Sequence, residues 1–517
     1  MMLTLFKFLL IAIGAVVAAG FVLRHMLALP RRRDVSAACH LPAPDDGPLA
    51  AAFGAAAARH PNASGVFSVA DAADAFALRV LLARAATRSI DAQYYIWHRD
   101  LTGILLLKEL RDAADRGVRV RILLDDNGTR GMDDLLCELH DHPNVEVRLF
   151  NPFALRAPKW LNYLLHFRRL NRRMHNKSLT VDNLATIVGG RNMGDSYFGT
   201  GANPLFIDLD ILAAGAVVPQ VSRDFDRYWN SAASYPVDLL VKGAPEGGIL
   251  DRLYNEALRH PARERFDANL GDAAPMRRLL AGETELHWVP VKLVSDDPAK
   301  VTGKLGRDRL LFSKISDAMG RPQMTLDVIS PYFVPGRAGC RAILGLREAG
   351  VVVRVMTNAL EATDVPAVHA GYARYRRALL QAGIELYELK AAAIPPAAPE
   401  DRRRLGSSAA SLHAKVLAVD GRSLYVGSLN FDPRSVFLNT ELGFIIDDPR
   451  MAEQVHEGVG RNAPRLAYSP GIDGDRLVWR ERTADGEEIL HGDEPGGSLG
   501  RRLIVMALSR LPVEWLL

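Results

Sequence analysis

The chain has 517 residues, of which 48% are hydrophobic and 24% are charged. This balance excludes a largely disordered chain and leaves room for about three globular domains. The formal net charge of +4 is too small to name a charged partner. Three cysteines, Cys39, Cys137 and Cys340, lie far apart without a C-x-x-C pair, which argues against a disulfide framework and a structural zinc site and suits a reducing compartment.

Residues 1–33 are predicted to form a membrane anchor with a basic flank. Residues 3 to 23 are apolar except for Thr4 and Lys7, and about 20 apolar residues span the hydrocarbon core of a bilayer. A cleaved signal peptide is the alternative, but its apolar region should be shorter and a small-x-small site should follow closely. Arginines follow instead, and they favour a cytoplasmic catalytic body, although Lys7 opposes that orientation.

Residues 34–62, rich in Ala, Pro, Asp and Gly, are predicted to form a linker, and residues 63–235 a first α/β domain. In this domain the helical pattern ADAFALRVLLARAATRSID leads into the strand SIDAQYYIW. The amphipathic helix GILLLKELRDAADRG then leads into the strand VRVRILLDD. Strand-helix-strand units of this kind give parallel pairing in a layered α/β sheet.

The same order of elements returns later in the chain. Residues 236–284 look like a charged, helical connection, and residues 285–468 are predicted to form a second α/β domain. Its strand TLDVISPYFVP is followed by the helix AILGLREAG and the strand VVVRVMTN. The segment 469–517 ends in LGRRLIVMALSRLPVEWLL, which is predicted to form an amphipathic helix packed on the body, with an interfacial membrane helix as the alternative.

One eighteen-residue motif occurs twice, as HNKSLTVDNLATIVGGRN from His175 and as HAKVLAVDGRSLYVGSLN from His413. Six residues recur at identical offsets. In the first copy they are His175, Lys177, Asp182, Gly189, Gly190 and Asn192, and in the second His413, Lys415, Asp420, Gly427, Ser428 and Asn430. Tyr94 and Tyr332 also precede the two motifs by equal distances. The pattern indicates an internal duplication that extends beyond the motif itself.

Each motif has the pattern of a β-hairpin, because a D-N or D-G turn separates two apolar runs. Residues two apart in a strand face the same side, so each His and Lys should project together, with the small residues and the Asn returning beside them. Asp182 and Asp420 then lie at the far turn, about 20 Å from the histidines. We expect the two aspartates to be turn formers.

Histidine, lysine, asparagine and small residues on one face suit an anion better than a metal, because the ammonium group repels a cation. Lysine and asparagine donate hydrogen bonds to phosphate oxygens, and glycine lets the backbone come close. Two motifs that meet would place two imidazoles beside one phosphate, where one can attack phosphorus and the other can protonate the leaving oxygen. Such chemistry needs no metal and no cofactor.

The paired H-x-K-x4-D-x6-G-[GS]-x-N motifs resemble the phospholipase D superfamily. From about residue 60 onwards, segments such as GVRVRILLDDNG and NFDPRSVFLNTELGF resemble bacterial cardiolipin synthases of the C type. The resemblance implies an α/β fold of two tandem domains related by duplication, an active site at their interface and a covalent phosphohistidine intermediate. It also implies transfer of a phosphatidyl group onto phosphatidylglycerol, with phosphatidylethanolamine as a candidate second substrate, at the bacterial inner membrane.

The same resemblance assigns roles to single residues. It implies that His175 is the nucleophile and His413 the acid/base, although the two motifs are nearly symmetric. It also implies that a carboxylate after each motif orients a histidine. By position these carboxylates are Asp208 and Glu441, with Asp210 left open as an alternative to Asp208. Gly190 stands where the second copy has Ser428, so any contribution of a hydroxyl to phosphate binding is one-sided.

A basic segment precedes the first motif. Between Val147 and Val181 there is no acidic residue, and aromatic and aliphatic residues alternate with lysines and arginines. This pattern fits an interfacial segment that binds anionic lipid. Nucleic acid is an alternative ligand for this pattern, but the membrane anchor favours lipid. The residues proposed to contact the substrate are Arg168, Arg169, Arg172 and Arg173.

These features together predict a membrane-anchored phosphatidyltransferase that makes cardiolipin and has phospholipids and the membrane, but no nucleic acid, as partners. A hydrolytic phospholipase D is the closest alternative, since water can replace the lipid hydroxyl without any change in the motifs. A nucleic-acid phosphodiesterase and an inactive binding scaffold are more distant alternatives.

Overall fold

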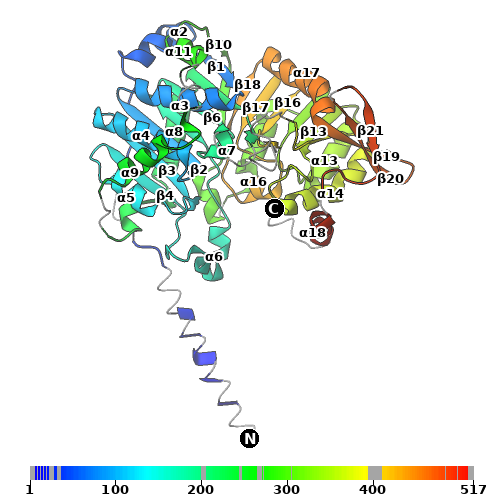
Figure 1. Ribbon diagram of the computed structural model, residues 1–517, viewed down its shortest axis with the longest axis horizontal. Helices are drawn as coiled ribbons and strands as arrows, with labels where there is room; N and C mark the ends of the chain where they lie inside the picture. The colour runs from blue at the N-terminus through cyan, green and yellow to red at the C-terminus, as the bar shows by residue number, and fades with distance from the viewer. Residues whose placement is uncertain are drawn as a thin grey trace.

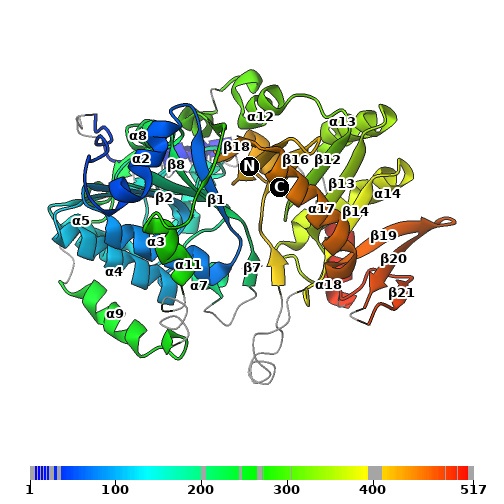
Figure 2. The same ribbon diagram turned by 90° about the horizontal axis from the view of Figure 1, so that it is seen from above.

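The computed structural model describes residues 37–199, 205–243, 247–264, 271, 273–303, 305–393, 410–483, 485–497 and 499–509, and a few positions between 6 and 31. Two α/β halves lie side by side, each built on one large mixed sheet with helices against it (Figures 1 and 2). A short parallel pair, β7 (Leu205–Ile207) with β15 (Ala410–Leu412), joins them. The described part of the chain therefore has the predicted tandem α/β fold.

The sheet of the first half has the strand order β10-β1-β8-β6-β5-β2-β3-β4-β9 among the described residues. Its strands are β1 (Ser64–Val69), β2 (Ser89–Ile96), β3 (Arg119–Gly128), β4 (Val145–Phe150), β5 (Ser178–Val181), β6 (Ala185–Gly189), β8 (Asp210–Gly215), β9 (Ser234–Pro236) and β10 (His287–Val289). Its helices are η1 (Ala50–Gly54), α2 (Ala55–Arg59), α3 (Ala72–Ala85), α4 (Leu101–Asp115), α5 (Asp133–His140), η2 (Lys159–Leu161), α6 (Asn162–Leu170), α7 (Asp195–Phe198), α8 (Val218–Trp229), η3 (Val237–Leu239), α9 (Ile249–Leu258) and α11 (Ala274–Leu280). The predicted strand-helix-strand unit forms the parallel strands β2, β3 and β4.

The sheet of the second half has the order β11-β18-β17-β16-β12-β13-β14-β19-β20-β21. Its strands are β11 (Val291–Ser295), β12 (Thr325–Ile329), β13 (Val352–Asn358), β14 (Glu385–Leu389), β16 (Val416–Val419), β17 (Ser423–Gly427), β18 (Leu442–Asp447), β19 (Ala467–Asp473), β20 (Arg476–Arg482) and β21 (Glu488–His491). Its helices are η4 (Pro298–Thr302), η5 (Arg307–Arg309), α12 (Leu311–Met319), α13 (Gly336–Glu348), α14 (Pro366–Gln381), α16 (Pro433–Phe437), α17 (Pro449–Leu466) and α18 (Leu499–Ser509). β12, β13 and β14 repeat the parallel unit of the first half.

The duplication is visible in the strand order. β1-β8-β6-β5-β2-β3-β4 of the first sheet has the same connectivity as β11-β18-β17-β16-β12-β13-β14 of the second. A buried aspartate–arginine pair recurs between equivalent strands, Asp91 with Arg121 and Asp327 with Arg354. However, Ile90 pairs with Val181 and Leu326 pairs with Val419, each at the same place after its motif histidine, so Ile90 and Leu326 are equivalent and the equally spaced Tyr94 and Tyr332 are not.

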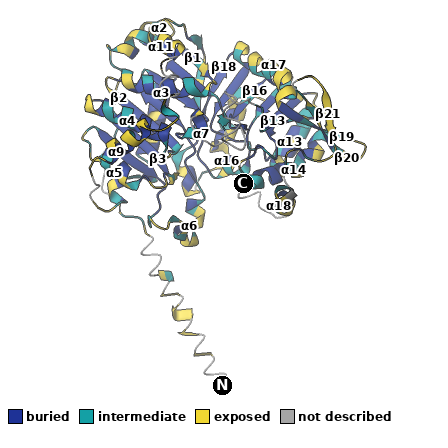
Figure 3. Ribbon diagram, viewed as in Figure 1, coloured by how far each residue is buried: buried dark blue, intermediate teal, exposed yellow. Residues whose placement is uncertain are grey.

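The two sheets share a hydrophobic core. Val188 and Ile211 from β6 and β8 belong to the same buried cluster as Val426 and Phe444 from β17 and β18. Figure 3 shows this buried layer continuing from one half into the other. Burial of apolar surface on both sides therefore holds the halves in a fixed relation, which a site built from both requires.

The ends of the chain differ in part from expectation. The predicted linker carries η1 and α2, and its Leu49 and Phe53 are buried in the core of the first half because they lie one helical turn apart. The predicted boundary at residue 285 lies just before β10, which still belongs to the first sheet. α18 packs through Val505 on Leu360 and Ala370, and the tail beyond residue 509 lies outside the described residues.

No helix among the described residues is both long and apolar enough to cross a membrane. The anchor predicted over residues 3 to 23 lies largely outside those residues. The positions described there are helical, and large apolar side chains among them, including Phe6, Ile11 and Phe21, are exposed.

Candidate active site

Both motifs form β-hairpins whose open ends meet between the halves. β5 pairs with β6 and β16 pairs with β17, both antiparallel. His175 and Lys177 lie just before β5, and His413 and Lys415 just before β16, rather than within the strands. All four side chains are at least nine-tenths buried. The hairpins thus deliver equivalent residues from each half to the same interface.

Each histidine is held by a carboxylate of the other half. His175 Nδ1 lies 2.8 Å from Glu441 Oε2, and His413 Nδ1 lies 2.6 Å from Asp208 Oδ2. The backbone repeats this exchange, because His175 N–H donates to Thr440 O and His413 N–H donates to Ile207 O, both at 2.8 Å. A carboxylate on Nδ1 orients the ring and leaves Nε2 for chemistry. Neither half alone supplies both the motif histidine and the carboxylate that holds it.

The structure separates the two candidate aspartates of the first half. Asp208 reaches His413, whereas Asp210 lies 2.9 Å from Arg79 and 3.2 Å from Arg191. Asp210 begins β8, and its two arginine partners are fully buried with it. Asp208 is therefore the carboxylate at the site, and Asp210 belongs to a separate ion cluster inside the first half.

The two motif lysines are buried cations without a carboxylate partner in the described parts of the chain. Lys177 Nζ donates to His175 O at 2.6 Å, and Lys415 Nζ donates to His413 O. Burial lowers the pKa of Lys177 well below its ordinary value and that of Lys415 to about 8. Because desolvation disfavours the charged ammonium, an anion placed between these groups would be stabilised strongly.

The two carboxylates differ in protonation. Burial raises the pKa of Glu441 to about 7, against the opposing effect of Lys177 and the Ser428 hydroxyl. Burial also disfavours the Asp208 carboxylate, but His413 and Lys415 keep the pKa of Asp208 below its ordinary value. Asp208 is thus ionised at neutral pH, whereas Glu441 titrates there.

Both histidines are neutral in the free protein. Burial and Lys415 lower the pKa of His413 to about 4, and burial and Lys177 lower that of His175 well below 6.5. Asp208 partly opposes this effect on His413. The negative charge of a bound phosphodiester would offset the positive charge of the two lysines, and it would therefore raise the pKa of both histidines.

The change from glycine to serine between the motifs has a geometric reason. A Cβ atom at Gly190 would come within 2.2 Å of Asp208 Oδ1, so any larger residue would displace this carboxylate. Ser428 instead donates its hydroxyl to Glu441. The two motif asparagines also differ, because Asn192 binds Ile96 N and the Tyr197 hydroxyl, whereas the buried Asn430 Oδ1 has no hydrogen-bond partner in the described structure.

Aromatic side chains that the sequence did not single out enclose the histidines. Tyr95 packs edge-on against His175 at 4.9 Å between ring centroids, and Lys177 Nζ lies 5.5 Å from the Tyr95 ring. Tyr197 and Phe206 contact the His413 ring at 5.2 and 5.0 Å. Tyr95 is the last tyrosine of the strand SIDAQYYIW, but its orientation toward the site depends on the sheet register.

Asp182 and Asp420 lie at the far turns of the hairpins, where both have φ of 53°. The Asp182 carboxylate accepts backbone N–H groups of Thr87, Arg88 and Ser89, at the start of β2. Asp420 does the same at the start of β12. The aspartates therefore join each hairpin to the adjacent strand as well as shaping a turn.

The four arginines before the first motif fall into two environments. Arg173 is buried and lies 2.6 Å from Asp125, and Arg169 donates to Asn151 Oδ1 and Pro152 O. Arg168 is exposed and Arg172 is half-buried. The segment between β4 and the first motif is thus attached to the body at its base, with α6 at its tip.

Comparison with known proteins is consistent with this geometry. The family described as "Cardiolipin synthase, PLD-like domain" matches residues 78–229 and 315–461, one copy in each half. The chain is 45% identical over 476 residues to cardiolipin synthase C of Escherichia coli K12, covering 91% of this chain and 99% of that protein. It is 26% identical to a cardiolipin synthase of Staphylococcus aureus strain Mu50, covering 72% of this chain and 62% of that one.

A solved structure shares the fold. Phosphatidylserine synthase of Haemophilus influenzae Rd KW20 superposes with a TM-score of 0.54 over 80% of this chain and 91% of its own, at 18% sequence identity. Two tandem domains on mixed sheets therefore persist in a protein whose sequence has diverged widely.

Proposed function

The chain belongs to the cardiolipin synthase, PLD-like domain family of the phospholipase D superfamily, and from this membership we propose that it transfers a phosphatidyl group onto phosphatidylglycerol to make cardiolipin. The observation that carries the proposal is the pair of histidines, each bound by a carboxylate of the opposite half, beside two buried lysines. A tetrahedral phosphodiester between two imidazoles needs this arrangement.

The proposed reaction has two steps. In the first, His175 Nε2 attacks the phosphorus of the donor phospholipid, the bond from phosphorus to the headgroup oxygen breaks, and protonated His413 gives its proton to that oxygen. In the second, His413 takes the proton from the terminal hydroxyl of phosphatidylglycerol. The resulting oxygen attacks phosphorus and releases His175.

The surroundings of the histidines support this division of roles. A general acid passes through an imidazolium, which an ionised carboxylate stabilises, and Asp208 is the carboxylate that stays ionised. Asp208 also raises the pKa of His413 against the effects of burial and Lys415, which favours the imidazolium that donates a proton. Lys177, Lys415 and Asn430 would stabilise the charge on the equatorial phosphate oxygens, and no cofactor is required. Asn192 would act through Tyr197, to which it donates at 2.8 Å.

The contact with the membrane is proposed from two apolar surfaces. On η2 and α6, Trp160, Leu164, Leu165 and Phe167 are exposed next to Arg168 and Arg172. In Figure 1, α6 projects from the body on the same side as the described turns of the N-terminal segment. Residues 3 to 23 would anchor the chain in the bacterial inner membrane with the body in the cytoplasm, and α6 would lie at the bilayer surface.

The four arginines would then act differently. Arg168 and Arg172 would contact phospholipid headgroups, whereas Arg169 and Arg173 would hold the segment through their bonds to the body. Residues close to His413, where the leaving oxygen is protonated, would distinguish a phosphatidylglycerol donor from a phosphatidylethanolamine donor.

Product analysis tests the proposed function. We expect the purified full chain, incubated with vesicles that contain phosphatidylglycerol, to form cardiolipin in excess over phosphatidic acid, and the His175→Ala variant to form neither. Phosphatidic acid as the dominant product would make the protein a hydrolase. Cleavage of DNA without lipid turnover would place its substrate outside the lipids.

A further inference from the structure

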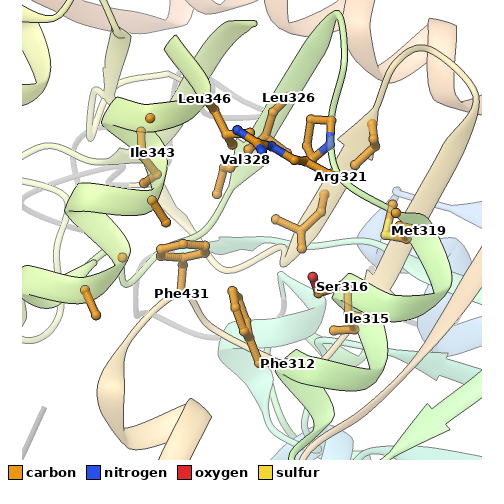
Figure 4. Close-up of a pocket in the computed structure, with 18 of the residues that line it drawn as sticks. Phe312, Ile315, Ser316, Met319, Arg321, Leu326, Val328, Ile343, Leu346 and Phe431 are labelled. Atoms are coloured by element: carbon orange, nitrogen blue, oxygen red, sulfur yellow. The ribbon is translucent and has the colours of Figure 1, made fainter. Parts of the chain in front are cut away.

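An apolar cavity separate from the histidine site lies in the half that carries His413. Its volume is about 700 Å³, and none of its lining residues belongs to the histidine site. α12 and α13 form its walls, and β12 and β16 form its floor through Leu326, Val328 and Leu417. Figure 4 shows Phe312, Ile343 and Phe431 pointing into the same space. The cavity is large enough for a substantial part of a lipid molecule.

The charge of this cavity is one-sided. Its lining contains two arginines, Arg321 and Arg341, and no acidic residue. Both arginines are exposed, and neither forms an ion pair with a carboxylate in the part of the chain that the structure describes. Figure 4 shows the Arg321 side chain lying across the cavity near Leu326 and Leu346. An apolar interior under a cationic rim complements a molecule with an apolar tail and an anionic head.

We propose that this cavity holds one acyl chain of an anionic phospholipid whose phosphate is bound by Arg321 and Arg341. The guanidinium fork matches a phosphate, and the apolar lining gains free energy by removing methylene groups from water. A peptide segment fits less well, because Ser316 is the only hydroxyl side chain of the lining and buried backbone groups would lack partners. The site goes beyond the proposed reaction, since the lipid it holds is not the one being cleaved.

One glycine allows the cavity to be filled without disturbing the fold. Gly345 lies in α13 and lines the cavity, and a Cβ atom there would meet no heavy atom within 4 Å. Gly345→Trp should occupy the space that the acyl chain would take, and Gly345→Ala should leave it open. Gly458 in α17 is equally unobstructed and does not line the cavity, so Gly458→Trp is a matched control.

The test uses the full chain with vesicles that contain phosphatidylglycerol carrying a photoactivatable group on one acyl chain. We expect labelled peptides from α12 and α13. Gly345→Trp should reduce this labelling about tenfold, the factor that roughly two buried methylene groups provide. Gly345→Ala and Gly458→Trp should retain it. Arg321→Gln with Arg341→Gln should reduce labelling by phosphatidylglycerol but not by a phosphatidylcholine probe.

Two results would overturn the site. Equal labelling of α12 and α13 by phosphatidylglycerol and phosphatidylcholine would show that Arg321 and Arg341 do not select an anionic headgroup. Absence of label from both helices, together with a change of oligomeric state in Gly345→Trp, would assign the cavity to a second copy of the chain. The His175→Ala variant should be labelled normally, so failure of the proposed reaction and failure of this site are distinguishable.

Discussion

Asp208 and Asp210 show how closely position decides the role of a carboxylate. Asp208 holds His413, and Asp210 neutralises Arg79 and Arg191. Asp208→Asn should therefore slow turnover by roughly 10²-fold to 10⁴-fold without changing stability much, because the amide can fix the wrong tautomer of His413. Asp210→Asn should instead cost about 3–5 kcal/mol of stability, since it leaves buried arginines unpaired. Steady-state kinetics and thermal unfolding of both variants check this contrast, and exchanged phenotypes would refute it.

Ser428 adjusts the pH at which the site works. Below a pH of about 7 Glu441 is protonated, and a protonated carboxyl donates to His175 Nδ1 and places the ring proton on Nε2, which blocks attack. Turnover should therefore rise with pH through about 7. Because the Ser428 hydroxyl stabilises the carboxylate, Ser428→Ala should raise the pKa of Glu441. The rising limb of the pH–rate profile should then move to a higher pH by about one pH unit.

A pH–rate profile measures the shift. Ser423→Ala, on the same strand β17, is the control and should leave the profile unchanged. A Ser428→Ala profile that coincides with wild type would show that another group sets the limb.

At the scale of elements, the hairpin turns connect to neighbouring strands. Although partial burial acts in the opposite direction, the backbone N–H groups at the start of β12 hold the pKa of Asp420 below its ordinary value. Asp420→Asn should cost about 1–2 kcal/mol of stability, since one acceptor oxygen and the charge are lost, while most turnover is retained. Asp182→Asn should cost more, because Asp182 is 1% exposed and also binds the Thr87 hydroxyl. Loss of Asp420→Asn turnover in a protein with unchanged melting would place this aspartate at the phosphate instead.

α6 is expected to act only at a membrane surface. Replacing Trp160 and Leu164 together with serine should reduce turnover on vesicles by about 100-fold or more, because each exposed apolar side chain contributes about 1.5–3 kcal/mol when fully buried in lipid. Turnover of a short-chain soluble diester should not change. Leu490→Ser, on the exposed strand β21, is the matched control. Equal losses on vesicles and on the soluble diester would mean that α6 supports the fold rather than the membrane contact.

The elements that the sequence predicted best are those fixed by local pattern. The parallel units, the two hairpins and the turn positions of Asp182 and Asp420 follow from apolar periodicity and D-N or D-G turns. What the sequence left open depends on tertiary contacts. Which half supplies the carboxylate for each histidine, the approach of Tyr95 to His175 and the burial of Arg173 against Asp125 all arise from packing between distant segments. The predicted linker differs in part from the structure for the same reason, because two of its apolar residues, Leu49 and Phe53, are buried in the core of the first half.

At the scale of the whole molecule, duplication has produced one site from two copies. The shared core of β6, β8, β17 and β18 and the β7–β15 pair hold the halves so that each completes the other. A nucleophile and an acid/base can then differ in environment while coming from the same motif, which a single copy within one chain could not provide.

The most direct test of this account is to trap the covalent intermediate and locate it. The full chain is mixed with phosphatidylglycerol carrying ³²P in its phosphate, quenched within one turnover, and the labelled peptide is identified. Wild type should carry the label on His175 as an acid-labile phosphohistidine, and His413→Ala, which lacks the proton donor of the first step and the proton acceptor of the second, should form it more slowly. His175→Ala should carry none. Label on His413 would reverse the proposed roles, and a fully active protein that never becomes labelled would contradict the covalent mechanism.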